Sequence, residues 1–350
     1  MELKKNNNKI INKNIENNND IIVGIDLGTN YSCISVFKNG SPNLILDQFG
    51  EYLIPSIIAF ENNIDPPFLG QMAKFKAEDE KNLLIFDTKR LIGKSYDDIN
   101  IKKDNFPFEL IKDQKTGRIK IKLKLPKKII DKNNNNNISY EEKEFSMEII
   151  TSIIIKHLKN IAENELKTKI NRAVISVPTS FNDVERELIK KAGEMAGFKV
   201  GLINEPSAAA LAYGFKENNN LFEEEKILVF NLGSGTFEVS LILLDFSDSK
   251  EIEVLATNQN LNFCGRNIDY KLLEKCLGKI NKNNYTINIK ENSNVIFKLL
   301  NECEKAKNIL SSKTSATIKI KNLFYNEDFE ITFSKEQFEN ECKNFFNNSC

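Results

Sequence analysis

The sequence predicts an α/β protein made of two related halves. Two observations indicate this fold class: strands and helices alternate through the middle of the chain, and one strand–turn–strand pattern occurs twice. IDLGTN (25–30) aligns with FNLGSG (230–235), which places Asp26 opposite Asn231, 205 residues later. A repeat this long indicates duplicated lobes and not a solenoid. The 350 residues also exceed one ordinary core, which favours two lobes.

The first copy of the pattern opens a predicted antiparallel sheet. A short apolar strand at 21–25 ends beside Asp26, and a second strand follows the LGTN turn at 33–37. Asn39-Gly40 is a strong hairpin signal, and a third strand is expected at 44–46. The ordered part of the chain is therefore expected to begin with three consecutive antiparallel strands.

The middle of the chain alternates helix and strand. Apolar residues at spacings of three and four from 147 to 161 predict an amphipathic helix. A buried-type strand at 173–177 precedes Asn182, which is suited to cap the next helix. Another strand at 201–204 leads into an alanine-rich helix with Pro206 in its first turn. This order implies parallel strand pairing, with helices on the faces of the sheet.

The second half repeats the strand pattern and ends in a helix. Its predicted strands lie at 227–230, 237–244 and 252–256, with a later hairpin at 316–320 and 329–333. Leu299 and Cys303 lie on the apolar side of a helix expected before that hairpin. Ser334 and Gln337 have the spacing of a capping box for a final helix.

Asparagine runs mark segments that are expected to lie at the surface. Residues 1–20 form a predicted disordered arm, and the runs at 133–137 and 218–220 are predicted disordered loop tips. Such tips lie on the surface, so they indicate where the core is not.

Composition excludes several classes of function. Lysine plus arginine and aspartate plus glutamate both number 49, so the zero net charge indicates neither a nucleic-acid nor a membrane partner. The six cysteines form no CxxC pair, which favours free thiols in a reduced compartment over a metal site. No apolar signal segment or spanning run occurs, so a cytoplasmic location is expected. The only histidine, His157, is expected to be structural.

The residue types of the duplicated turn are suited to binding phosphate. Gly28 lets the backbone approach phosphate oxygens closely, and Thr29 with neighbouring backbone N–H groups can donate hydrogen bonds to them. Asp26, at the end of its strand, can bind Mg²⁺ through water, because magnesium keeps much of its hydration shell. One such turn is a weak signal, but two facing copies would clamp a polyphosphate from both sides.

Six segments occur in an order that is typical of one protein family: IVGIDLGTNYS (22–32), FDTKRLIG (86–93), AVISVPTSFND (173–183), INEPSAAALAYG (203–214), VFNLGSGTFEVS (229–240) and CEKAKNILSS (303–312). Through these segments the sequence resembles the nucleotide-binding domain of the Hsp70 chaperone family, from about residue 21 to residue 345. Actins and sugar kinases share the two phosphate turns but do not resemble the remainder this closely. The resemblance implies an actin-like (ribonuclease-H-like) ATPase fold, with two duplicated lobes and ATP in the cleft between them.

The resemblance also implies domain boundaries. Lobe I would cover 21–213, a connecting loop 214–225, and a partial lobe II 226–350. The final strand–helix units of lobe II, with the Gly-Gly segment that closes over the adenosine, are absent from this sequence, as is the peptide-binding domain. Lobe II is therefore expected to be incomplete, and binding of client peptides is not expected.

Site residues follow from the matching positions. Lys89 would point at the phosphates and orient the attacking water, Glu205 would lie near the metal-bound water, and Asp26 would hold Mg²⁺ through water. The other implied contacts to ATP or ADP are Gly28, Thr29, Asn30, Tyr31, Gly233, Ser234, Gly235, Thr236, Gly265, Glu304, Lys307, Asn308 and Ser311. Pro178 and Arg186 resemble the relay that reports the nucleotide state to the peptide-binding domain.

Departures from the family pattern cluster at the nucleotide. Asn231 replaces an aspartate beside Mg²⁺ and the γ-phosphate, so the shape is kept and the charge is lost. Loss of one electrostatic contributor typically costs about 3–4 kcal/mol of transition-state stabilisation. The other departures are Asn30 for threonine, Ser234 for glycine, Glu238 for aspartate, Asn308 for arginine, and Cys264-Gly265-Arg266-Asn267 for Gly-Gly-Glu-Asp.

Two functions fit these observations. The first is a chaperone-related domain that binds Mg–ATP and hydrolyses it weakly or not at all, acting in protein folding and the stress response. The second is a non-enzymatic interaction module, or a degenerate paralogue, that keeps the surfaces for J-domain co-chaperones and nucleotide exchange factors. A sugar-kinase-like or actin-like function lacks support, because no substrate insert or filament signature occurs.

Overall fold

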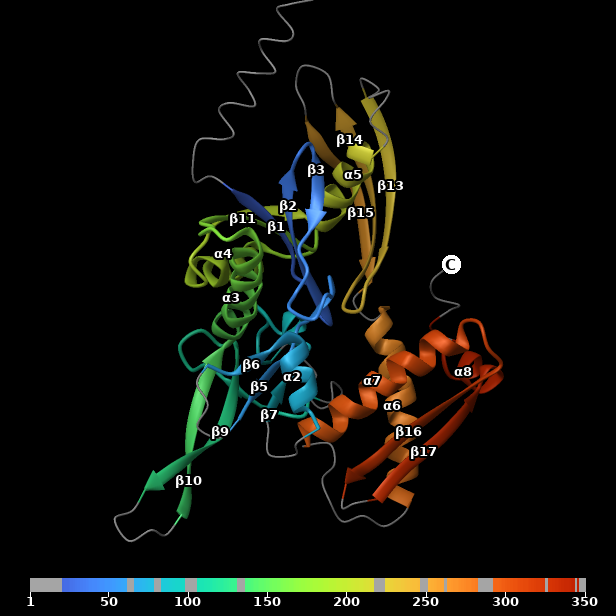
Figure 1. Ribbon diagram of the computed structural model, residues 1–350. Coiled ribbons are helices and arrows are strands. Elements are labelled where there is room, and N and C mark those ends of the chain that lie inside the picture. Colours follow the sequence, from blue (N-terminus) through green and yellow to red (C-terminus); the bar gives the residue numbers. More distant parts are fainter. Residues whose placement is uncertain are drawn as a thin grey trace, which may run out of the picture.

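The computed structural model describes residues 21–61, 66–78, 83–97, 106–130, 136–216, 224–245, 251–260, 263–282, 292–324, 327–343 and 345. The predicted arm at 1–20 and the asparagine run at 218–220 lie outside these residues. The described residues form helices and mixed sheets, which confirms the α/β class (Figure 1).

The largest sheet is built around the first copy of the repeated pattern. Five of its strands are, in spatial order, β12 (Lys199–Asn204), β11 (Arg172–Val177), β1 (Ile22–Asp26), β2 (Tyr31–Lys38) and β3 (Ser41–Leu44), and the short β4 (Ile54–Pro55) also pairs with β2. β1 runs antiparallel to β2, and β11 runs parallel to β12, both as predicted. β1 also pairs with β11, in parallel. Asn39 and Gly40 have φ values of 55° and 78°, which suit a two-residue hairpin. β3 therefore begins directly after them, at 41 and not at 44.

Two long helices pack on this sheet and on each other. They are α3 (Met147–Leu166) and α4 (Asp183–Met195), and their apolar residues join the same core as the strands. The predicted cap of α4 is confirmed: the Asn182 side chain accepts from the Glu185 N–H at 3.0 Å, and the Glu185 carboxylate accepts from the Asn182 N–H at 2.8 Å. α5 (Glu205–Lys216) follows β12 directly.

Several smaller elements lie between β3 and α3, and the sequence patterns did not define them. They are β4 (Ile54–Pro55), β5 (Ile58–Phe60), β6 (Phe68–Leu69), α2 (Gly70–Lys76), β7 (Leu83–Ile85), the 3-10 helix η1 (Thr88–Arg90), β8 (Glu109–Lys112), β9 (Ile119–Ile130) and β10 (Asn136–Ser146). Asn136 and Asn137 pair with Ile130 and Ile129, so this part of the run predicted as a loop tip is strand.

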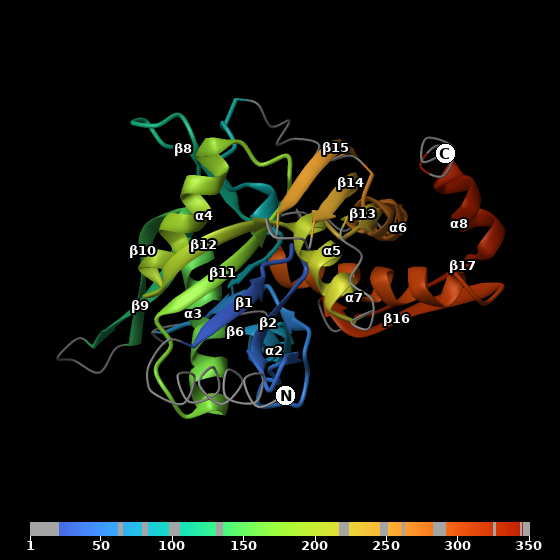
Figure 2. The same cartoon turned by 90° about the horizontal axis from the view of Figure 1, so that it is seen from above.

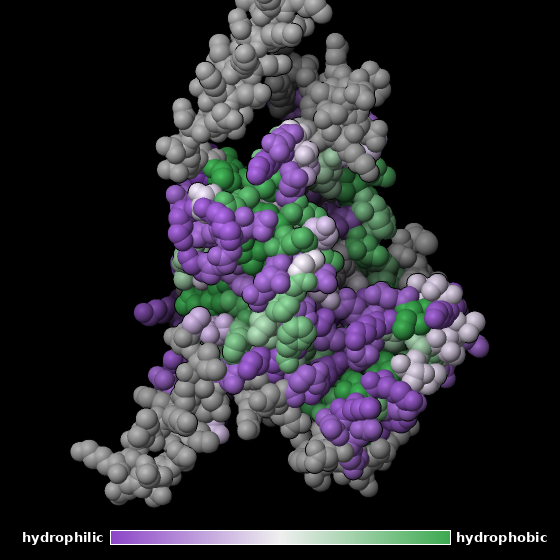
Figure 3. Space-filling view, in the orientation of Figure 1, coloured by the Kyte–Doolittle hydropathy of each residue, from purple (hydrophilic) through white to green (hydrophobic). Residues whose placement is uncertain are grey.

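The second copy of the pattern forms a separate sheet. Its strands are β13 (Glu224–Leu232), β14 (Phe237–Asp245) and β15 (Ile252–Asn260). α5 packs against one face, where Ile227 and Val229 contribute to a small core. On alternate positions of β13, Leu228 and Phe230 are exposed. Figure 3 shows hydrophobic surface in this upper part of the molecule, where Figure 1 places β13.

The two halves of the chain are joined by a shared hydrophobic core. α6 (Gly265–Lys282), which was not among the predicted elements, and α7 (Ser293–Leu310) pack against β5, β7 and α2. The rings of Phe86 and Phe297 lie 5.3 Å apart in this core. In Figures 1 and 2 the first turns of α7 accordingly lie beside β7 and α2 of the first half.

The last described elements confirm two predictions. The expected hairpin is β16 (Ser315–Phe324) with β17 (Glu327–Ser334), and α8 (Lys335–Glu341) follows it. The Ser334 hydroxyl accepts from the Gln337 N–H at 3.1 Å, and the Gln337 side chain accepts from the Ser334 N–H at 3.0 Å. Within the described ranges, no helix has both the length and the apolar character needed to cross a bilayer.

Candidate functional site

The two copies of the turn face each other across one cleft of about 920 Å³. β1 and β2 line it from one side, and β13 with the turn after it lines it from the other. The structure brings most of the predicted site residues together here. They are Asp26, Gly28, Thr29, Asn30, Tyr31, Lys89, Glu205, Gly233, Ser234, Gly235, Thr236 and Glu304.

The two turns approach each other so closely that glycine is required at their contact. A Cβ atom at position 235 would overlap the Thr29 hydroxyl of the other turn, and within the first turn a Cβ at position 28 would overlap the backbone carbonyl of Tyr31. Glycine relieves both clashes because it has no side chain. The turns therefore meet at Thr29 and Gly235, and the cleft opens beside this contact.

Three polar residues, Lys89, Glu205 and Asn231, form one polar group beside the turns. The Lys89 ammonium contacts the Glu205 carboxylate at 2.7 Å, and both side chains are nearly buried, at 11% and 14% exposure. The Asn231 amide donates to the other oxygen of Glu205 at 3.2 Å. An ionised aspartate at position 231 could not donate this hydrogen bond. Asn231 therefore supports the charge of Glu205, where an aspartate would repel it.

Asp26 presents its carboxylate at the mouth of the first turn. It ends β1, opposite Ser176 of β11 and Cys33 of β2. The Ser176 hydroxyl donates to Asp26 at 2.9 Å, and the residue is otherwise exposed in the cleft. An exposed, oriented carboxylate suits contact with a hydrated Mg²⁺ ion.

Asn30 is held by partners from the second half of the chain. Its amide donates to Glu304 of α7 at 3.1 Å, and its side-chain oxygen accepts from Arg266 of α6 at 3.2 Å. Burial, and then the Glu304 carboxylate, raise the pKa of the neighbouring Tyr31. The phenol therefore stays neutral at physiological pH and keeps its proton for donation.

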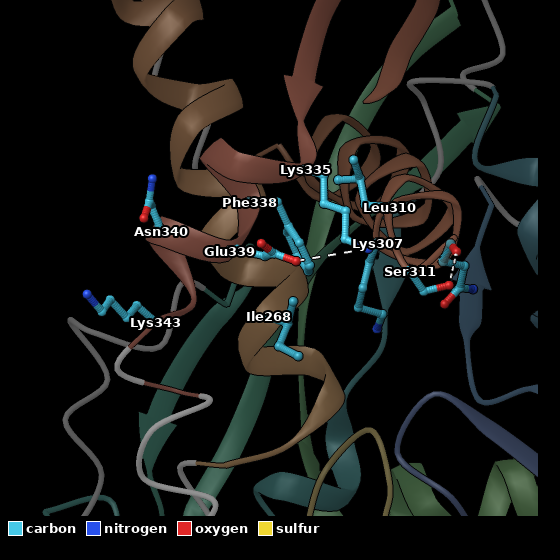
Figure 4. A pocket seen from close by; sticks show the side chains of 10 residues that line it. Ile268, Lys307, Leu310, Ser311, Lys335, Phe338, Glu339, Asn340 and Lys343 are labelled. Atoms are coloured by element: carbon cyan, nitrogen blue, oxygen red, sulfur yellow. Dashed lines mark hydrogen bonds and ion pairs between the residues drawn. The ribbon is translucent and has the colours of Figure 1, made fainter. Parts of the chain in front are cut away.

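The predicted adenosine contacts on α7 are divided between two cavities. Glu304 faces the cleft, whereas Lys307, Asn308 and Ser311 line a neighbouring cavity of about 650 Å³. Figure 4 shows side chains of α6, α7 and α8 converging on this second cavity. Gly265 lies between the two, because its N–H donates to the Gly233 carbonyl at 2.9 Å and its own carbonyl accepts from Lys307 at 3.3 Å.

A buried ion pair next to the cleft had no role in the sequence-based prediction. Arg266 is 2% exposed and Asp87 is fully buried, and their side chains approach to 2.7 Å. Arg266 stood out only as a departure from the resembling family, and Asp87 only as part of a matching segment. The signal that could have found the pair is charge: a cation replaces an anion at a position expected near the nucleotide.

With this geometry established, a comparison with known families decides the relationship. A family model described as Hsp70 protein matches residues 22–350. The chain belongs to the Hsp70 family. The match begins at the first residue of β1 and includes both turns, Lys89 and α7. The family has an actin-like ATPase fold and generally binds ATP or ADP with Mg²⁺, and the α/β architecture agrees with that fold.

In this Hsp70 protein, the two predicted relay residues lie together. The Arg186 guanidinium donates to the backbone carbonyls of Phe181 at 2.8 Å and of Pro178 at 3.3 Å. It also donates to the side chain of Asn204 at 2.8 Å. Asn204 directly precedes Glu205, so this network connects the Pro178 loop with the polar group of the cleft.

Proposed function

We propose that this Hsp70 protein binds Mg–ATP between the two turns and hydrolyses it weakly or not at all. The observation that carries the proposal is the group formed by Lys89, Glu205 and Asn231 beside Asp26. This group supplies a cation for phosphate and a carboxylate for hydrated Mg²⁺. It lacks the second carboxylate that the family resemblance assigns to position 231.

Each residue of the group has a separate task in binding. Asp26 would hold Mg²⁺ through water, and the backbone N–H groups of both turns would donate to phosphate oxygens. Lys89 would exchange its contact with Glu205 for a phosphate oxygen, because a polyphosphate carries more negative charge than one carboxylate. Glu205 would then be available to orient metal-bound water.

Hydrolysis depends on charge that this cleft does not supply. Stabilising a transition state needs fixed charges placed where charge develops, and removal of one contributor costs about 3–4 kcal/mol. Asn231 can donate or accept hydrogen bonds, but it neither balances a metal ion nor takes a proton from the attacking water. Binding with slow turnover follows from this difference.

The relay network supports a chaperone-related role for the bound state. Arg186 ties the Pro178 loop to Asn204 through contacts that do not involve Asn231. We propose that this network still transmits nucleotide binding to the protein surface. Partners would be J-domain co-chaperones and exchange factors, in the cytoplasm. The non-enzymatic interaction module is the alternative, in which these surfaces work without nucleotide.

Calorimetric titration with Mg–ATP, followed by a phosphate-release assay, tests the proposal. Saturable binding with release at the background rate is expected. Absence of binding at millimolar ATP overturns it, and fast release overturns the hydrolysis part. Binding of a purified J-domain by a protein that does not bind ATP supports the interaction module instead.

A further inference from the structure

The most enclosed ion pair at the site joins the two halves of the chain. Asp87 precedes η1 in the first half, and Arg266 lies in the first turn of α6 in the second half. Three hydrogen bonds connect them: Arg266 Nε donates to both carboxylate oxygens at 3.1 and 2.8 Å, and Nη2 donates to one of them at 2.7 Å. Tyr270 donates a further bond to Asp87 at 3.2 Å.

The Arg266 guanidinium stays charged in spite of its burial. Burial by itself lowers the pKa of Arg266, but the charge and hydrogen bonds of Asp87, together with Tyr270 and Asp269, raise it overall. Burial and the Asp87 charge raise the pKa of Tyr270, so its phenol remains a donor. The backbone of Asp87 has a φ of 57°, a conformation that aspartate and asparagine tolerate better than most residues. The local backbone is thus shaped to hold this side chain in place.

Arg266 also reaches toward both ends of the proposed nucleotide site. On the phosphate side its Nη2 donates to Asn30, next to Thr29 of the first turn. On the adenosine side its Nη1 lies 3.7 Å from Asp269, whose other carboxylate oxygen contacts Lys307 at 2.8 Å. One guanidinium therefore connects a phosphate turn with a residue of the predicted adenosine contacts.

We propose that Arg266 is a positioning residue of the nucleotide site. Anchored by its ion pair with Asp87, it fixes Asn30 and, through Asp269, Lys307 relative to each other. The proposal rests on the proposed binding of Mg–ATP and adds to it. Arg266 does not contact the nucleotide in this account. It holds side chains from both halves in the arrangement that binds, so that less ordering is needed when ATP enters.

A purely structural role predicts a different result from a positioning role. A buried ion pair can often be replaced by a neutral pair with little loss of stability, whereas removal of one partner leaves a buried charge uncompensated. Stability and nucleotide affinity can therefore be separated. The double variant Asp87→Asn with Arg266→Gln removes both charges, and Asn suits the positive φ at position 87.

The experiment measures melting temperature and Mg–ATP affinity for the single variants, the double variant and Lys271→Gln. Lys271 is an exposed lysine of the same helix and serves as the control. Each single variant is expected to melt several degrees lower, and the double variant to regain most of that loss. Affinity is expected to stay roughly tenfold weaker in the double variant, the effect of about one charged hydrogen bond. A double variant with wild-type affinity overturns the proposal.

Two further measurements cover the remaining outcomes. If the double variant does not fold, Arg266→Lys keeps the charge opposite Asp87 but lacks the fork that reaches Asn30 and Asp269 together, so the same loss of affinity is expected. If the wild type does not bind ATP, the proposed function fails by itself. Hydrogen exchange of the turn at 27–31 is then compared between nucleotide-free wild type and nucleotide-free Arg266→Lys. Faster exchange in the variant supports the positioning role of Arg266, and unchanged exchange overturns it.

Discussion

The two copies of the strand–turn–strand pattern are similar in sequence, but their environments in the fold differ. Three apolar residues occupy equivalent positions in the two copies: Val23 and Ile25 of β1 with Leu27 of its turn, and Leu228, Phe230 and Leu232 of β13. Those of β1 and its turn are at most 3% exposed, whereas their counterparts are 46–69% exposed. Equal side-chain patterns therefore do not imply equal burial.

The neighbours of each strand explain the difference. β1 has a strand on each edge, β11 and β2, and shares a core with α3 and α4. Among the described residues, β13 pairs with β14 alone, and α5 covers its other face, beside Ile227 and Val229. The comparison teaches that the first copy provides the rigid side of the cleft and the second copy the less supported side.

The better supported copy also carries more charge at its turn. The first turn follows Asp26, a charged residue held by Ser176, and the second follows the neutral Asn231. Lys89 and Glu205 also come from the part of the chain before β13. The charges that we propose bind phosphate and metal are therefore concentrated on the better supported side.

The largest expected effect tests the difference in burial directly. Ile25→Ala should lower the free energy of unfolding by about 2–5 kcal/mol, because it opens a cavity in a closed core. The equivalent change, Phe230→Ala, should cost less than about 1 kcal/mol, because its side chain is 63% exposed. Urea unfolding of both variants checks this. Equal losses would show that β13 is as well packed as β1.

The next effect compares the two sides of the cleft in binding. Lys89→Met should weaken Mg–ATP binding by about 1.5–3 kcal/mol, since a charged hydrogen bond to phosphate is lost. Thr236→Val, on the other turn, should cost about 1 kcal/mol or less, the value of a neutral hydrogen bond. Calorimetry on both variants measures the ratio, with Lys271→Met as the exposed control. A larger loss for Thr236→Val contradicts the assignment.

A smaller effect concerns Asn231 without nucleotide. The Asn231 Nδ2 atom lies 3.2 Å from Glu205 Oε2 and donates a hydrogen bond to it. Asn231→Asp removes this hydrogen bond and places a second carboxylate beside Glu205. The free energy of unfolding should fall by about 1 kcal/mol at neutral pH, and added Mg²⁺ should restore part of it. Thermal unfolding with and without Mg²⁺ tests this. A stabilised variant in the absence of metal would count against the interpretation of Asn231 as a support for Glu205.

The smallest effect is a pH dependence confined to the first half. Burial lowers the pKa of His157, although the Asp47 carboxylate opposes this. The unfolded chain, with a histidine pKa of about 6.5, then binds a proton more readily than the folded one. The contribution is fully present above pH 6.5 and is lost as the pH falls toward the lower folded pKa. His157→Gln should flatten the stability profile in this range, and an unchanged profile excludes His157 as its source.

Local signals predicted local features well. The capping boxes of α4 and α8 and the Asn39-Gly40 hairpin were predicted because their residues lie within a few positions of each other. The candidate site residues grouped at the cleft were predicted from the duplicated turn and the family resemblance. Both signals point to positions in the sequence without needing a three-dimensional structure.

Long-range contacts were beyond such signals. Asp87 and Arg266 are 179 residues apart, and although the unusual cation at position 266 is visible in the sequence, it does not indicate which carboxylate it meets. The contact between Phe86 and Phe297 likewise joins residues that are far apart in the sequence and show no local signal of meeting. α6, by contrast, has the local signal of a helix, since Ile268, Leu272, Cys276 and Ile280 recur every four residues. The exposure of Leu228 and Phe230 depends on neighbours of β13 that periodicity does not describe.

The most direct test of the central claim is a single-turnover measurement of phosphate release from bound Mg–ATP, in the wild type and in Asn231→Asp. The account predicts that the wild type binds ATP and releases phosphate at the background rate. Asn231→Asp should raise the rate by about 100-fold or more, the effect of restoring one electrostatic contributor. Rapid release by the wild type, at a rate that Asn231→Asp leaves unchanged, would contradict the claim that charge at position 231 limits hydrolysis.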